Sequence, residues 1–185
     1  MVYKNVAKVN VPHTVPKVQK HNHEEANTLI PLHVIYAFKD YTWGEICVLS
    51  SNTDVFVLLI DVAANGHLGV GAQLKFITGK GANQHTINIL ERVCLLGTHK
   101  SQGLLGLHNF SGAHWSGKFI GISKRTWVKA YLALDDDDPI IDLFIHLGKG
   151  PLSSTLLVDG KLPAEIRSVE KFGCQVIPHW QTLQY

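Results

Sequence analysis

The sequence predicts a single α/β domain, and three observations support this interpretation. The chain has 185 residues, which is enough for one domain and tight for two at about 150 residues per domain. Apolar residues make up 45% of it and charged residues 17%, a balance typical of a globular protein with a buried core. Short apolar runs that suit strands alternate with longer segments patterned as helices. This alternation favours a three-layer α/β/α arrangement around a mainly parallel sheet.

The first half of the chain supplies the alternating elements. We expect a helix over residues 23–38, a strand over 45–49 and a helix or second strand over 55–64. A strand over 73–79 and a helix over 86–96 follow. Acidic residues at the start of the first segment suit the positive end of a helix dipole, and Pro31 is expected to kink that helix. The segment 55–64 is apolar throughout, so periodicity alone does not decide its type. Gly97 is a plausible C-cap for the last helix.

The second half is more helical. An apolar stretch from residue 104 runs into a turn rich in small residues, followed by a helix over 128–134. The acidic run Asp135–Asp138 is expected to be a solvated linker before a helix over 139–147, and a last helix over 164–176 closes the domain. Three parts are therefore expected: an extended N-terminal arm over residues 1–20, a core over 21–134, and a C-terminal helical extension over 135–185.

Composition limits the class of protein more than its function. The net charge of +2 is too small to predict nucleic-acid binding. The three cysteines form no CxxC pair, and two of them lie in apolar runs, as reduced core cysteines of an intracellular protein do. No signal peptide is evident, and no apolar run reaches the ~18 residues that span a bilayer. We therefore expect a nuclear or cytoplasmic protein with no membrane partner.

Asp54 stands where a ligand site is expected. It follows a predicted strand, and ligands of open α/β sheets bind at the carboxyl ends of strands. The alternative is that Asp54 caps the next helix, and from this stretch alone the cap is favoured. A second candidate is the turn carrying Lys118, Lys124 and Arg125. Its backbone amides and cations suit a phosphate backbone, although an ordinary solvated helix start fits equally well.

Three blocks carry a resemblance to a known family. They are His23–Thr28 (HEEANT), Ser51–Leu59 (SNTDVFVLL) and Leu107–Lys124 (LHNFSGAHWSGKFIGISK), followed by Trp127. In this order and spacing they resemble the flap-endonuclease/XPG-like branch of the PIN-like nuclease superfamily. The nearest pattern is that of its divergent copies in transposon-associated and uncharacterised animal proteins. Each block alone is weak, and the specificity comes from the three together over residues 21–134.

The resemblance implies phosphodiester hydrolysis by two divalent ions, normally Mg or Mn, held by carboxylates at strand ends. Five family carboxylate positions fall on Glu25, Asn27, Asn52, Asp54 and His114. Three of them are therefore no longer acidic, and Glu24 is a possible substitute. Losing three charges weakens a dicationic site by several kcal/mol at an effective dielectric of ~20. The family also begins with a strand bearing another acid, and this chain is expected to lack it. A partner chain, a missing N-terminal segment or the arm is then expected to complete the sheet.

Three functions remain open on these grounds. The first is a degenerate nuclease-like domain, a pseudoenzyme with little or no catalysis, and this is favoured. The second is an active metal-dependent nuclease with an altered site, in which His114 would favour Mn, Zn or Co. The third is a module that binds DNA or RNA, or a protein partner, through the turn carrying Lys118, Lys124 and Arg125. His99, His108 and His146 are expected to be core or surface residues without a role.

Overall fold

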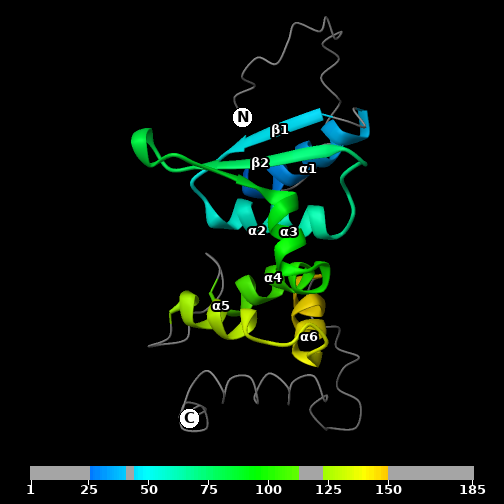
Figure 1. Cartoon of the computed structure of the whole chain (residues 1–185), viewed down its shortest axis with the longest axis vertical. Helices are drawn as coiled ribbons and strands as arrows, with labels where there is room; N and C mark the ends of the chain where they lie inside the picture. The colour runs from blue at the N-terminus through cyan, green and yellow to red at the C-terminus, as the bar shows by residue number, and fades with distance from the viewer. Residues whose placement is uncertain (1–25, 41–43, 113–122, 150–185) are drawn as a thin grey trace, which may run out of the picture.

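The computed structural model describes residues 26–40, 44–112 and 123–149 (Figure 1). In these ranges it contains helices and strands in the order α1 (Ala26–Asp40), β1 (Gly44–Leu49), α2 (Thr53–Ala64), β2 (Ala72–Thr78), the 3₁₀ turn η1 (Gly81–Asn83), β3 (His85–Asn88), α3 (Ile89–Leu96), α4 (Thr98–Phe110), α5 (Lys124–Leu132) and α6 (Pro139–Gly148). The α/β class is confirmed. Among the described helices, none combines the length and apolar character needed to cross a bilayer. The predicted arm and the last predicted helix lie outside the described residues.

The sheet is mixed rather than mainly parallel. Its strand order is β1-β2-β3; β1 pairs with β2 in parallel and β2 pairs with β3 in antiparallel. The start of the helix predicted over 86–96 was wrong, because residues 85–88 form β3. Gly79 makes this reversal possible. It has φ +87°, and a Cβ at this position would lie 2.1 Å from the backbone oxygen of Asn83. The chain therefore turns back tightly enough for β3 to pair with β2.

The sheet buries one face in the described part of the chain. On that face Val48, Leu74 and Phe76 pack against α1 and α2, whose core residues include Val55 and Leu59. On the other face Glu45, Cys47, Leu49 and Gln73 are exposed, and Glu45 forms an ion pair with Lys75. Alternation along β1 and β2 explains this division, because successive side chains point to opposite faces. The described residues thus place helices on one face, and a third layer remains a prediction.

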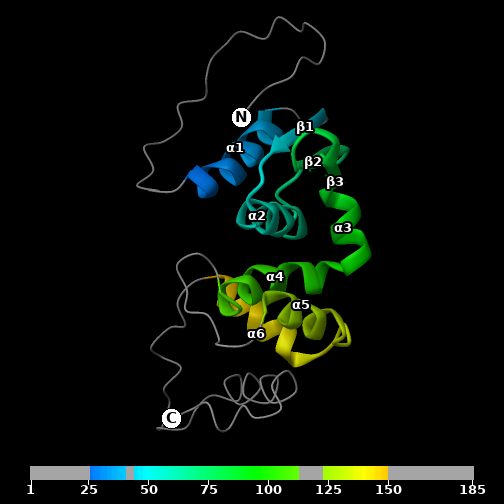
Figure 2. The ribbon, with the colours of Figure 1, turned by 90° about the vertical axis from the view of Figure 1, so that its left-hand side faces the viewer.

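A second core lies among α4, α5 and α6, and α2 packs between the sheet and this helical part (Figure 2). Its centre is aromatic: Phe144 meets both Phe110 and Tyr131 edge-on, with ring centroids 5.7 and 5.6 Å apart. The sequence did not predict α4, which contains Gly103 and Gly106. Both glycines lie at close approaches, and a Cβ on Gly106 would meet the backbone of α6. The two helices therefore pack backbone against backbone.

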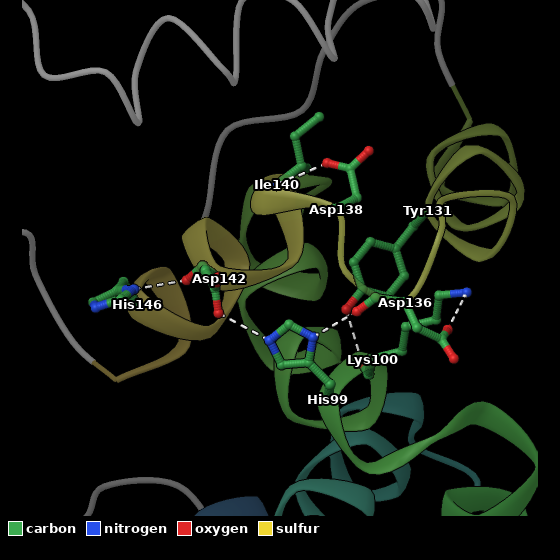
Figure 3. A network of polar contacts seen from close by, with 8 residues as sticks. All are labelled: His99, Lys100, Tyr131, Asp136, Asp138, Ile140, Asp142 and His146. Atoms are coloured by element: carbon green, nitrogen blue, oxygen red, sulfur yellow. Dashed lines mark hydrogen bonds and ion pairs between the residues drawn. The ribbon is translucent and has the colours of Figure 1, made fainter.

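A polar junction joins the start of α4 to the acidic loop before α6 (Figure 3). His99 Nδ1 lies 2.9 Å from the Asp136 carbonyl oxygen, and His99 Nε2 lies 2.9 Å from Asp142 Oδ1. Asp136 also forms an ion pair with Lys100 at 2.9 Å. The Asp138 side chain caps α6. Two expectations need correction here: His99 has a structural role, and the acidic run is more than a solvated linker, although its residues 135–137 are exposed.

This junction predicts a pH effect on stability. The backbone carbonyl of Asp136 and then the carboxylate of Asp142 raise the pKa of His99 above its usual 6.5. Both acceptors are satisfied when both ring nitrogens carry protons. Because the folded-state pKa is raised, this stabilisation is complete below pH 6.5 and is lost as pH rises through the folded pKa. We expect the melting temperature to fall less between pH 6 and 8 in His99→Gln than in the wild type, measured by circular dichroism. Equal pH profiles in the two proteins would contradict this role.

Candidate functional site at the carboxyl end of β1

The turn after β1 fixes the start of α2. Ser50 Oγ accepts a hydrogen bond from the Asn52 amide at 3.1 Å, and Asn52 Oδ1 accepts one from the Asp54 amide at 2.9 Å. Asn52 has extended backbone geometry and is the N-cap, so α2 begins at Thr53. The prediction that Asp54 is the cap was therefore wrong. The segment 55–64, left open between helix and strand, is helical. Asp54 lies in the first turn of α2, where a negative charge favours the helix dipole.

Asp54 is engaged by a histidine from another helix. His108 Nε2 lies 2.8 Å from Asp54 Oδ1 and joins the last turn of α4 to the first turn of α2. The Asp54 side chain is only 17% exposed and that of His108 only 6%. A contact this short between poorly exposed groups is stronger than a surface pair, because water screens it less. The expectation that His108 has no role was wrong.

Lys124, the first residue of α5, completes this cluster. Its Nζ lies 3.3 Å from His108 Nε2 and donates to the Gly112 carbonyl oxygen at 3.3 Å. An imidazole nitrogen either carries a proton or accepts one. An ionised Asp54 can only accept, so Nε2 carries the proton and donates to Asp54. Lys124 is then a neighbouring cation that donates to Gly112 and makes no hydrogen bond to Nε2. We call Asp54, His108 and Lys124 the Asp–His–Lys cluster.

The electrostatics of this cluster keep its histidine neutral. Burial is the largest cause that lowers the pKa of His108 below 6.5, and the charge of Lys124 lowers it further. The hydrogen bond and the charge of Asp54 raise it, but less. His108 is therefore a neutral donor at pH 7, and the opposite charges of Asp54 and Lys124 both lie beside its Nε2. This arrangement ties three helices together and holds Asp54 in one orientation.

The other predicted site residues are distributed as follows. Glu24, Glu25, His114 and Lys118 lie outside the described residues. Asn27 is half-buried in the first turn of α1, and Arg125 is exposed beside Lys124 at the start of α5. Within the part of the chain that the structure describes, the predicted residues brought together are Asn52 with Asp54, and Asp54 with Lys124 through His108.

The described residues do not fit a dimetal site on their own. Among them, no three His, Cys, Asp or Glu side chains lie close enough to hold a metal ion. One oxygen of Asp54 accepts from His108, and the Asn52 oxygen is bound to a backbone amide. The ammonium of Lys124 adds a positive charge near Asp54, which opposes a divalent cation. No metal-dependent step is therefore derived for this cluster.

Comparisons with known proteins do not identify a family for this chain. No protein-family model, curated protein or solved structure matches this chain.

Proposed function

We propose that this chain is a PIN-like nuclease domain with a degenerate site that serves in nucleic-acid backbone binding rather than catalysis. The observation that supports it most is the state of Asp54. A catalytic carboxylate must offer its oxygens to metal ions, whereas Asp54 accepts a hydrogen bond from His108 and lies near Lys124. This position has the properties of a structural contact, as expected of a site that has lost three of five acids.

The exposed side of α5 supports the binding part of the proposal. Arg125 and Lys129 are exposed and lie four residues apart, so they share one side of the helix. The first turn of α5 contains no acidic residue, and the N-terminal end of a helix attracts phosphate. The prediction that Lys124 contacts phosphate fits less well, because its ammonium donates to Gly112 beside His108. Lys129 was not predicted, although its spacing from Arg125 gives the signal.

Binding of a fluorescent single-stranded oligonucleotide, followed by anisotropy at several salt concentrations, tests this proposal. We expect binding that weakens with salt and has no requirement for a divalent ion. The double substitution Arg125→Gln/Lys129→Gln should weaken binding and reduce the salt slope by about 1.4, because each lost contact with a single strand contributes about 0.7. DNA and RNA oligonucleotides of the same sequence identify the preferred nucleic acid.

The double substitution Lys80→Gln/Arg92→Gln is the matched control, since both residues are exposed, lie outside α5 and carry the same two charges. It should leave the salt slope unchanged. An equal loss of binding affinity in the control would show that only net charge matters. It would contradict a specific role for α5. Cleavage of a flap substrate with Mg or Mn that Asp54→Ala abolishes would instead support an active phosphodiesterase. The first result would overturn the proposed binding through α5, and the second would overturn the proposed lack of catalysis.

A further inference from the structure

A cavity of about 260 Å³ lies at the end of α2 opposite to Asp54. It is lined by residues of α2, α4 and α6 and of the turns after α2 and α6, namely Asp61, Asn65, His67, Gln102, Ile145, Gly148 and Lys149. Pockets for drug-sized ligands have about 300–1,000 Å³, so this one suits a smaller molecule. The Asp–His–Lys cluster contributes nothing to its lining.

Asp61 is the acidic group of this cavity. Its Oδ1 accepts a hydrogen bond from Asn65 Nδ2 at 2.9 Å, and Asn65 Oδ1 accepts one from Gln102 Nε2 at 3.3 Å. Asp61 Oδ2 receives no hydrogen bond from the described residues. Burial raises the pKa of Asp61, which means that its charge is less well stabilised than in water. A ligand cation would compensate that charge.

Lys149 is the basic group of the same cavity. Its ammonium makes no ion pair or hydrogen bond within the described part of the chain, and it is not close enough to Asp61 to form one. Its charge nevertheless acts on Asp61, as does that of His67. The half-buried Asp61 and the exposed Lys149 thus both line the cavity without pairing with each other. The C-terminal ends of α2 and α6 also reach it, and such ends favour a cation.

We propose that this cavity binds a small zwitterion, a molecule with one ammonium and one carboxylate group such as a free amino acid. Its ammonium would donate to Asp61 Oδ2, and its carboxylate would accept from Lys149. Ile145 supplies an apolar wall for a short aliphatic part. This site is separate from the proposed nucleic-acid surface, and neither proposal depends on the other.

Titration of the full chain with alanine, followed by nuclear magnetic resonance, tests this inference. We expect saturable shifts of amide signals around residues 61–67 and 145–149. Ethylamine and propionate each carry one of the two charges and should bind at least about tenfold more weakly, because each lacks one charge-assisted hydrogen bond. Ethylamine binding as tightly as alanine would show a simple cation site and overturn the proposal.

Two substitutions locate the site. Asp61→Asn removes the charge but keeps an oxygen that can accept from Asn65, so the fold should be retained. Asp61→Asn and Lys149→Gln should each weaken alanine binding about tenfold or more. Asp137→Asn and Lys80→Gln make the same charge changes at exposed positions away from the cavity and should leave binding unchanged. Equal affinity in all four variants, or no saturable shifts in the wild type, would overturn the proposal.

Discussion

Replacing Gly106 by alanine should destabilise the protein by about 3 kcal/mol or more, at the upper end of the usual overpacking cost. A Cβ at this position would lie 1.8 Å from the backbone oxygen of Phe144 and 2.7 Å from its carbonyl carbon. These atoms belong to the backbone of α6, so no side-chain rotation relieves the clash. The two helices would have to separate, and the aromatic core behind Phe144 would loosen.

The sign of this effect is diagnostic. Glycine to alanine inside a helix normally stabilises by about 1 kcal/mol, because alanine has the higher helix propensity. Urea unfolding followed by circular dichroism measures the free energy of unfolding of Gly106→Ala against the wild type. Gly44→Ala is the matched control, since a Cβ there has no atom within 4 Å, and it should be close to neutral. A stabilised Gly106→Ala would mean that α4 and α6 do not pack backbone against backbone.

The elements that sequence predicted are those with local signals. β1 and β2 were predicted from short apolar runs between turn residues, and the helix predicted over 139–147 begins at a proline, as α6 does. The cap that Asp138 supplies was not predicted. Residues 86–88 of β3 were predicted as helix because they continue into an apolar periodicity of helical type, and only pairing with β2 makes them a strand. α4 was missed because Gly103 and Gly106 lower helix propensity. Gly106 makes room for the backbone of α6 and Gly103 for the Tyr131 hydroxyl of α5, and both neighbours lie far along the chain.

The site residues also separate into those with a local sequence signal and those without one. Asp54 was predicted because its place after a strand is a local property of the sequence. Its partner His108 is 54 residues away, and no local pattern joins the two residues. Lys124 was predicted to face phosphate because it precedes a helix. Its inward orientation depends on the carbonyl of Gly112 and on the ring of His108. Contacts of this kind arise from packing and leave no periodic signal.

Removing the carboxylate of Asp54 should cost about 1–4 kcal/mol of stability. Asp54→Ala leaves a buried His108 N–H without its acceptor, which costs about 1–3 kcal/mol. It also removes a negative charge from the first turn of α2, worth about 0.3–1 kcal/mol. The loss of stability caused by Asp54→Ala should be larger with Lys124 present than in a Lys124→Gln background. In the first case the Lys124 ammonium loses the nearby negative charge of Asp54. Chemical unfolding at pH 7 measures this change.

A double-mutant cycle separates this contact from general damage. Asp54→Ala and His108→Ala, alone and together, each remove the contact and should give a coupling energy of about 1–3 kcal/mol, the upper range for contacting residues. The control cycle uses Glu45→Gln and Lys75→Gln, an ion pair on the open face of the sheet, whose coupling should be smaller because water screens it. Coupling as small as in the control would show that the Asp–His–Lys cluster contributes little to the fold.

The same proteins distinguish a structural Asp54 from a metal ligand. A ligand that binds only the folded state raises the melting temperature. Millimolar Mg or Mn should therefore leave the wild-type melting temperature unchanged, since the Asp54 oxygen already accepts from His108 and Lys124 lies beside it. The pKa of His108 gives a second check. Because this pKa is lower in the folded protein, the unfolded state takes up the proton more readily, and stability is lost as pH falls below 6.5. A metal-induced rise in the wild type that Asp54→Ala abolishes would return Asp54 to the metal chemistry of the nuclease family.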